Sequence, residues 1–96
     1  MTAYILAQIS IHDRERYDRY AAGFFPTLAP YEGRLLAADE GPMVLEGDWG
    51  RDKAVLIAFP DEARALAWGQ SDAYRAISVD REAATEGTVL LIRGFG

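Results

Sequence analysis

The stretch Lys53-Ala54-Val55-Leu56-Ile57-Ala58-Phe59-Pro60-Asp61 decides the fold of this chain. A strand with one face in solvent alternates apolar and polar side chains, because successive residues point to opposite faces of a sheet. This stretch does not alternate, since residues 54–59 are apolar on both faces. We therefore predict a strand that needs cover on both sides. The Pro-Asp pair that follows predicts a capped helix directly after the strand.

The size and charge of the chain narrow the class of protein. With 96 residues, 50% hydrophobic and 26% charged, a single globular domain over residues 1–96 is expected. The net charge is −5 and Lys53 is the only lysine, so neither nucleic acid nor a membrane surface is expected as a partner. There is no cysteine, no basic leader and no apolar run of transmembrane length, which favours a cytoplasmic location.

The first half of the chain predicts a strand, a helix and a second strand. Tyr4–Ile11 alternates with one wholly apolar face, and Asp13 is placed to cap the helix that follows. We expect this helix to kink at Pro26, and we expect Pro30 together with Gly33 to end it. The second strand is predicted at residues 34–38, with a turn at 39–42 and a continuation at 43–46.

The second half predicts the strand at 53–59 and then helices capped by Asp61 and Ser71. The first of these is expected to turn Ala63, Leu66 and Ala67 inward, and the second to cover residues 72–84. Gly87 is expected to separate it from a last strand at 88–93, which is apolar on both faces.

The order β-α-β-β-α-β predicts an α+β fold, a four-stranded antiparallel sheet with its helices on one face. The helices cover only that face, yet the third and fourth strands are apolar on both. An open sheet face of this size is an uncommon apolar patch on a soluble monomer. A homodimer formed through the sheet face is therefore expected.

Aromatic residues recur at helical spacing along the first helix, among them Tyr17, Tyr20 and Tyr31. Such a stripe is typical of the core side of an amphipathic helix. It also suits the wall of a pocket for an aromatic substrate between this helix and the sheet, because buried tyrosine hydroxyls can orient a ligand.

A second candidate set lies before the third strand and comprises Glu46, Asp48 and Trp49, with Arg34 on the same hairpin. In one interpretation Trp49 walls a pocket and Arg34 binds a ligand carboxylate. In the other, which the expected dimer favours, Asp48 holds the turn and Trp49 anchors the partner subunit.

The remaining polar residues give little support for a reaction centre. His12 is the only histidine, and no ligand pattern accompanies it, so no metal, haem or other cofactor is expected. Ser71 has no nucleophile motif around it, and the glycines form no phosphate-binding loop.

Several short motifs carry a family resemblance over nearly the whole chain. They are Glu46-Gly47-Asp48-Trp49, Phe59-Pro60, Ala67-Trp68, Ser71 with Tyr74, Tyr31 with Gly33 and Arg34, and Ala83-Ala84. In these the chain resembles domain-of-unknown-function family 1330, of the dimeric α+β barrel superfamily. The resemblance implies a ferredoxin-like protomer and a dimeric α+β barrel, but no agreed activity. The chain departs from the family pattern at Glu32, where a glycine is usual, and at Asp72, where proline is frequent.

Two function classes follow. The first is a small homodimer that binds or converts a hydrophobic or aromatic molecule without a metal, with Tyr20, Tyr31, Arg34 and Trp49 as candidate ligand-binding residues. The second is a non-catalytic dimeric module with a filled barrel.

Overall fold

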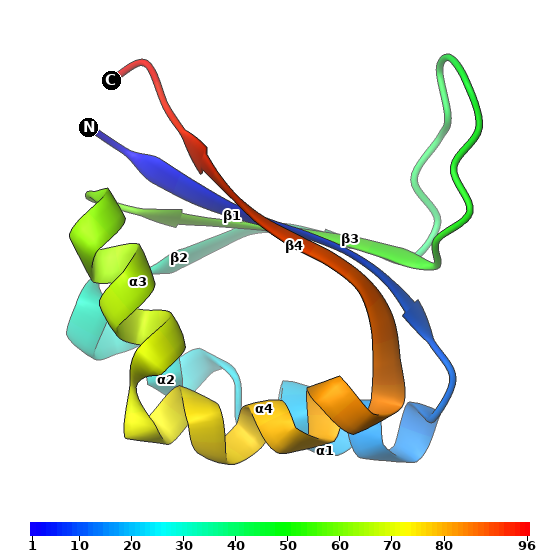
Figure 1. Cartoon of the computed structure of the whole chain (residues 1–96), viewed down its shortest axis with the longest axis horizontal. Coiled ribbons are helices and arrows are strands. Elements are labelled where there is room, and N and C mark those ends of the chain that lie inside the picture. The colour runs from blue at the N-terminus through cyan, green and yellow to red at the C-terminus, as the bar shows by residue number, and fades with distance from the viewer.

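The computed structural model describes residues 1–96 as one antiparallel sheet with all helices on one of its faces (Figure 1). The strands are ordered β2-β3-β1-β4. They comprise β1 (Ala3–Ile11), β2 (Arg34–Asp39), β3 (Lys53–Phe59) and β4 (Thr85–Arg93). The helices are α1 (Arg14–Ala22), α2 (Phe25–Leu28), the 3-10 turn η1 (Ala29–Tyr31), α3 (Glu62–Gln70) and α4 (Asp72–Ala84). The predicted ferredoxin-like α+β fold is confirmed.

The predicted helix caps are also confirmed. Asp13, Asp61 and Ser71 each accept a hydrogen bond from the backbone N–H three residues later, at 3.2, 2.8 and 3.2 Å. Each bond satisfies one of the donors that a helix leaves free at its first turn. The start of every long helix was therefore readable from the sequence.

The prediction of one helix with a kink at Pro26 is wrong, because this region forms two separate helices. α1 ends at Ala22 and α2 begins at Phe25, with Pro26 in its first turn. Proline is well tolerated there, because the first turn has no hydrogen-bond acceptor for its missing N–H. Pro26 therefore starts a helix, and the break lies upstream of it.

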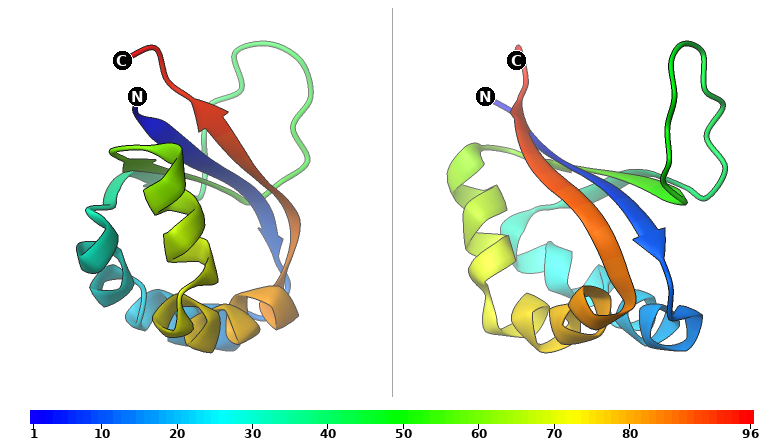
Figure 2. Two further views of the ribbon diagram at one scale, coloured as in Figure 1. Left: turned by 60° about the vertical axis from the view of Figure 1, so that its left-hand side comes forward. Right: turned by 45° about the vertical axis from the view of Figure 1, so that its right-hand side comes forward.

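The predicted continuation of the second strand at residues 43–46 is wrong. β2 pairs with β3 only as far as Asp39 opposite Ala54, and residues 40–52 form a loop. Figures 1 and 2 show this loop standing out on the side of the sheet away from the helices. Asp52 holds its end to β1: its backbone N–H donates to Ile9 O at 2.8 Å, and its carboxylate accepts from Ile11 N at 2.8 Å.

The buried face of α3 and the start of β4 also differ from the prediction. Ala65 and Trp68 are the buried residues of α3, whereas Ala63, Leu66 and Ala67 are exposed. The prediction failed because alanines occur on several sides of this helix, so the sequence does not indicate which side is buried. β4 already starts at Thr85, so Gly87 lies inside it.

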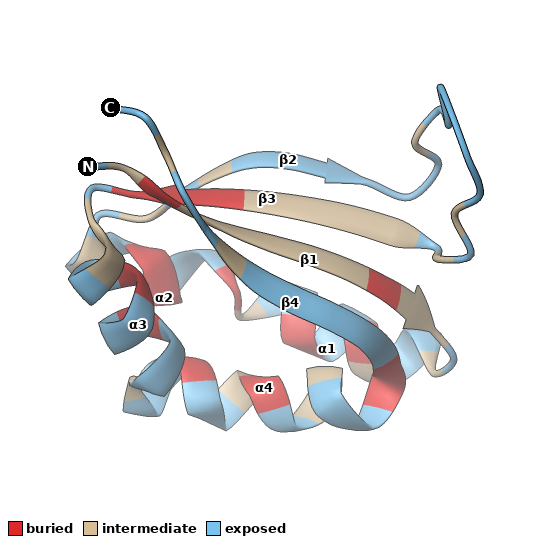
Figure 3. Cartoon of the chain, turned by 45° about the horizontal axis from the view of Figure 1, so that its top comes forward, coloured by how far each residue is buried: buried red, intermediate tan, exposed pale blue.

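Buried residues lie at both ends of the sheet, with Phe59 and Ala3 at one end and Ile9 and Thr85 at the other. Trp68 packs at the first of these ends against Phe59 and Phe24, with ring centroids 5.3 and 6.0 Å apart. Figure 3 shows buried residues on the helices and at both ends of the sheet, while much of the middle of the sheet is only half-buried or exposed. None of the helices has the length and apolarity that a membrane crossing requires.

The outer face of the sheet carries a row of leucines. Leu6 on β1 lies directly opposite Leu56 on β3 and Leu90 on β4, and all three point away from the helices. Leu90 is 46% exposed. Leu6 and Leu56 are half-buried, and no helix of the protomer packs on this outer row, Leu56-Leu6-Leu90.

Candidate functional site

A cavity of about 460 Å³ lies between the helices and the inner face of the sheet. Hydrophobic residues make up 17 of the 21 that line it, including Ile5 and Val55 from the sheet and Phe24 and Trp68 from the helices. Its size is within the range of pockets that bind small organic molecules. The middle of the sheet is thus only half-buried because space, not side chains, lies beneath it.

The cavity is open to the surface at several of its lining residues. Phe25 and Leu66 both line it, yet they are 63% and 48% exposed. Gly69 and Gln70, at the end of α3, also line the cavity and are exposed. Val89 on β4, 51% exposed, also lines the cavity, so the cavity reaches the surface in more than one place.

Two tyrosines and an arginine form a polar group in the apolar wall. The hydroxyl oxygens of Tyr20 on α1 and Tyr74 on α4 lie 3.0 Å apart, and both side chains are buried. Arg81, two helical turns after Tyr74, donates from Nε to the Tyr74 hydroxyl at 3.2 Å. All three residues line the cavity.

One phenolic proton of this pair has no partner within the protein. The two hydroxyls carry two protons, and the bond between them uses one. Tyr74 accepts from Arg81, and no other hydrogen bond involves either hydroxyl. Burial, followed by the proximity of Tyr74, raises the pKa of Tyr20 above its usual range, so this hydroxyl stays protonated at neutral pH. The pair therefore offers one O–H donor to an acceptor in the cavity.

Lys53 is the second cation at the cavity wall. Its ammonium lies 4.8 Å from the centroid of the Tyr17 ring and 3.9 Å from Oε2 of Glu40. Only 14% of its side chain is exposed. A carboxylate and an aromatic face thus already stabilise the charge of Lys53.

The structure separates the four residues predicted as ligand-binding candidates. Tyr20 lines the cavity. Tyr31 is half-buried in η1 and packs on the core without lining the cavity. Arg34, opposite Ala58, begins β2 on the outer side of the sheet and is exposed.

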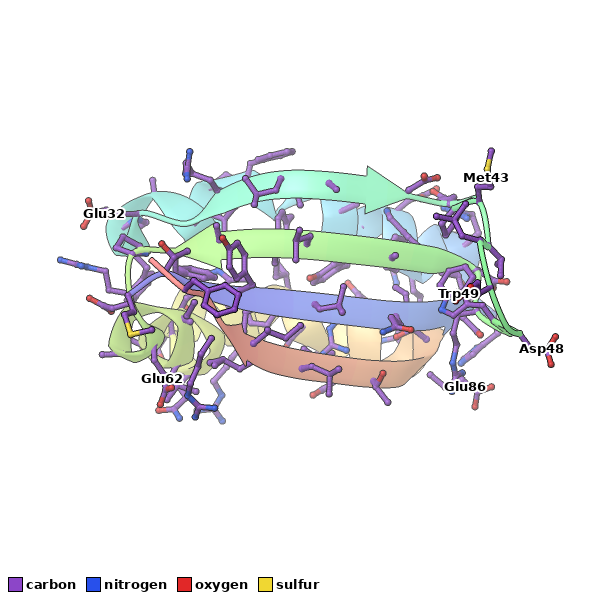
Figure 4. All side chains as sticks on the ribbon, turned by 90° about the horizontal axis from the view of Figure 1, so that it is seen from above. Glu32, Met43, Asp48, Trp49, Glu62 and Glu86 are labelled. Carbon is purple, nitrogen blue, oxygen red and sulfur yellow. The ribbon has the colours of Figure 1, made fainter.

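Trp49, the fourth candidate, also lies on the outer side. Its Nε1 donates to Oε1 of Gln8 at 2.9 Å, which returns the loop 40–52 to the end of β1. Figure 4 looks onto this face and shows Trp49 over the end of the sheet and Asp48 pointing outward. The Asp48 side chain forms no hydrogen bond, so the turn is held by Asp52 and Trp49 instead.

Sequence reasoning did not single out Tyr74, Arg81 and Lys53 as site residues. A signal for two of them was present, because Tyr74 and Arg81 are seven residues apart in one helix and so share a face. What the sequence did not indicate is that this face of α4 meets Tyr20 of α1, 54 residues from Tyr74.

No group of three or more His, Cys, Asp or Glu side chains comes together to hold a metal ion. His12 is exposed at the end of β1, and its backbone N–H donates to Ala84 O at 2.9 Å. The polar groups of the cavity are therefore tyrosine hydroxyls, the Gln70 amide and two cations.

Comparison with solved structures gives matches over the whole chain. A protein of unknown function from Rhodopseudomonas palustris is 16% identical, with a TM-score of 0.82 over 99% of this chain and 83% of that one. A dimeric ferredoxin-like protein of unknown function from Jannaschia sp. CCS1 is 19% identical, with a TM-score of 0.70 over 98% and 100%. SnoaB, a cofactor-independent oxygenase from Streptomyces nogalater, is 11% identical, with a TM-score of 0.63 over 99% and 94%.

At these identities the likeness shows the fold alone. No curated protein matches the chain. The family model described as "Domain of unknown function (DUF1330)" matches residues 2–95. The chain therefore belongs to the DUF1330 family.

Proposed function

We propose that this protein is a homodimer that binds a compact hydrophobic or aromatic molecule in the cavity between its sheet and helices. The observation that carries the proposal is the apolar cavity of about 460 Å³ with a free hydroxyl donor in its wall. Pockets for small organic molecules have this composition, a mostly apolar lining with a few polar groups that fix orientation. The second interpretation, a module with a filled interior, agrees less well with this space.

Binding is the proposed activity, and any conversion of the ligand would depend on the same polar group. The chain has no cysteine, and its one histidine lies outside the cavity. An acid–base step would therefore use Tyr20 or Tyr74, with Arg81 stabilising negative charge. We also propose a cytoplasmic location, with which a chain without cysteine is compatible.

The dimer is proposed to form through the outer face of the sheet. The outer row Leu56-Leu6-Leu90 is apolar, and no helix of the protomer packs on it. Met43 and Leu45, 83% and 85% exposed, extend the apolar surface along the loop 40–52, on the same side. A second copy placed sheet to sheet would cover both. Structural neighbours described as dimeric support a dimer as such.

The binding proposal is tested by a thermal-shift screen against small aromatic acids, quinones and lactones. A ligand present at a hundred times its Kd stabilises the folded protein by about 2.7 kcal/mol, which is readily measured. The two tryptophans then locate the hits by NMR. The indole N–H signal of Trp68 in the cavity should shift, and that of Trp49 on the outer face should not.

A cavity-filling variant gives the control. Ala7→Leu adds bulk to the inner face of β1 inside the cavity and should abolish binding. Ala76→Leu adds the same side chain to the exposed side of α4 and should leave binding intact. A screen in which no compound shifts Trp68, or in which the hits bind Ala7→Leu equally well, would contradict the proposed function.

A further inference from the structure

The charged side chains that line the cavity are all positive. Lys53 and Arg81 are the charged residues among those that line it, and both are positive. No aspartate or glutamate lines the cavity, although the chain carries 15 of them and a net charge of −5. The local charge of the cavity is therefore opposite to that of the whole protein.

Arg81 differs from Lys53 in having no acidic partner. Lys53 forms an ion pair with Glu40, whereas Arg81 takes part in no salt bridge, and its guanidinium donates only to the neutral hydroxyl of Tyr74. Arg14, Arg16 and Arg19 in contrast each pair with a carboxylate. An arginine has five N–H donors, so most of those on Arg81 are left without a protein partner.

A half-buried guanidinium without a counter-ion is costly unless water or a ligand satisfies it. A carboxylate matches it, because two oxygens accept from two parallel N–H groups of one guanidinium. The free phenolic proton of the Tyr20–Tyr74 pair adjoins Arg81 and supplies a further donor. Neighbouring donors in an otherwise apolar wall favour an anion attached to an apolar body.

We propose that the ligand of this cavity is an aromatic or other apolar carboxylate, held by Arg81 and by the one free hydroxyl proton of the Tyr20–Tyr74 pair. The apolar body lies among the hydrophobic lining residues, and the carboxylate takes the place of the counter-ion that Arg81 lacks. This inference rests on the proposed function and specifies the class of its ligand.

The experiment compares 2-naphthoate with its neutral isostere, 2-naphthamide, by isothermal titration calorimetry and by the Trp68 indole signal. In the unmodified protein the carboxylate should bind roughly tenfold more tightly than the amide. The extra binding free energy of a charge-assisted hydrogen bond over a neutral one corresponds to about this ratio of Kd values. Arg81→Gln should remove this preference while binding of the amide changes little. Tyr20→Phe/Tyr74→Phe should weaken binding of the carboxylate, because the double substitution removes both hydroxyls and keeps both rings.

Arg75→Gln is the matched control, because Arg75 lies on the same helix, is exposed, makes no salt bridge and does not line the cavity. It should retain the full preference for the carboxylate. If Arg81→Gln does not fold, as judged by circular dichroism, Arg81→Lys replaces it. Arg81→Lys keeps the positive charge but cannot bind a carboxylate in a bidentate manner, so it should retain only part of the preference for the carboxylate.

The outcomes separate this inference from the proposed function. Equal binding of the two probes, or tighter binding of the amide, overturns the carboxylate inference and leaves the binding cavity standing. A preference that persists in Arg81→Gln overturns the assignment to Arg81. If neither probe shifts Trp68, both this inference and the proposed use of the cavity by aromatic ligands are contradicted.

Discussion

The indole nitrogen of Trp68 lies 3.0 Å from the hydroxyl oxygen of Thr27, and both side chains are buried. This bond joins α3 to α2 beside the cavity and satisfies a donor that water does not reach. Thr27→Val keeps the shape of the side chain but leaves the indole N–H unpaired, so we expect a loss of about 1–3 kcal/mol in the free energy of unfolding. Urea denaturation followed by circular dichroism measures it. Thr27→Ser, which keeps the acceptor, should lose less; equal losses would contradict this explanation.

Glu32 occupies a left-handed backbone conformation, with φ at 57°. Residues with a side chain are strained in this conformation and glycine is not. Glu32→Gly and Glu32→Ala both remove the ion pair with Arg64, whose Nε lies 3.2 Å from Oε2 of Glu32. We therefore expect the glycine variant to be more stable than the alanine variant by about 1 kcal/mol. Chemical denaturation of the two proteins side by side tests this, and a more stable alanine variant would refute it.

Gly87 sits within β4 at a φ of 152°, where its α-carbon approaches the backbone of β1. A β-carbon at this position would overlap the carbonyl oxygen of Gln8. Gly87→Ala should therefore push β4 from β1 and cost about 2 kcal/mol or more in stability. Gly41→Ala is the control, since a β-carbon there meets nothing within 4 Å. Thermal melts of the two variants should differ clearly; a Gly87→Ala protein as stable as the control would show that the strands tolerate the side chain.

Asp80 on α4 holds two arginines of α1, with Arg16 Nε at 3.0 Å and Arg19 Nη2 at 3.3 Å. The hydrogen bonds from Arg16 and Arg19 lower the pKa of Asp80 below its usual range. Because the unfolded chain binds this proton more tightly, the stabilisation is complete above about pH 4 and is lost as the pH falls through the lowered pKa. Asp80→Asn should therefore weaken the dependence of stability on pH below about pH 4.

Denaturant titrations at a series of pH values from neutral to strongly acidic measure this dependence. The control is Asp48→Asn, because the Asp48 side chain forms no hydrogen bond or salt bridge and points outward. Asp48→Asn should leave the dependence of stability on pH below about pH 4 unchanged. The assignment to Asp80 fails if the two variants show the same pH dependence.

Leu90 tests the proposed dimer. Leu90→Glu places a charge in the outer row Leu56-Leu6-Leu90, where sheet-to-sheet packing would bury it without a partner. We expect light scattering to give twice the protomer mass of 10.6 kDa for the unmodified protein and a single protomer for the variant. Val79→Glu, at an exposed position of α4, should remain dimeric. An unmodified protein of 10.6 kDa at micromolar concentration would rule out the dimer.

Features set by local chemistry were predictable from the sequence. The apolar run 54–59 indicated a central strand, and the short acceptors Asp13, Asp61 and Ser71 marked the starts of three helices. Errors arose where the same local pattern suits more than one structure. Met43-Val44-Leu45 looks like a strand, but its apolar side chains project from a loop.

The cavity could be predicted only in part. The stripe containing Tyr20 indicated a surface between the first helix and the sheet, but not whether side chains or space fill it. That outcome depends on how far α4 stands from β1, which is set by packing between distant segments. Trp49 illustrates the same difficulty, since only the three-dimensional structure shows that it turns to Gln8 on the outer face.

The strand order also has a consequence for how fast the chain folds. β1 is central and pairs only with β3 and β4, so none of its hydrogen bonds can form until segments more than 40 residues away have been brought to it. The only strands that are consecutive in both chain and sheet, β2 and β3, are separated by the loop 40–52. Sheets built from such distant pairings close late, because the entropy of loop closure is lost before any pairing compensates it. The capped helices should therefore acquire structure first, and the rate-limiting step should be the arrival of β4 beside β1.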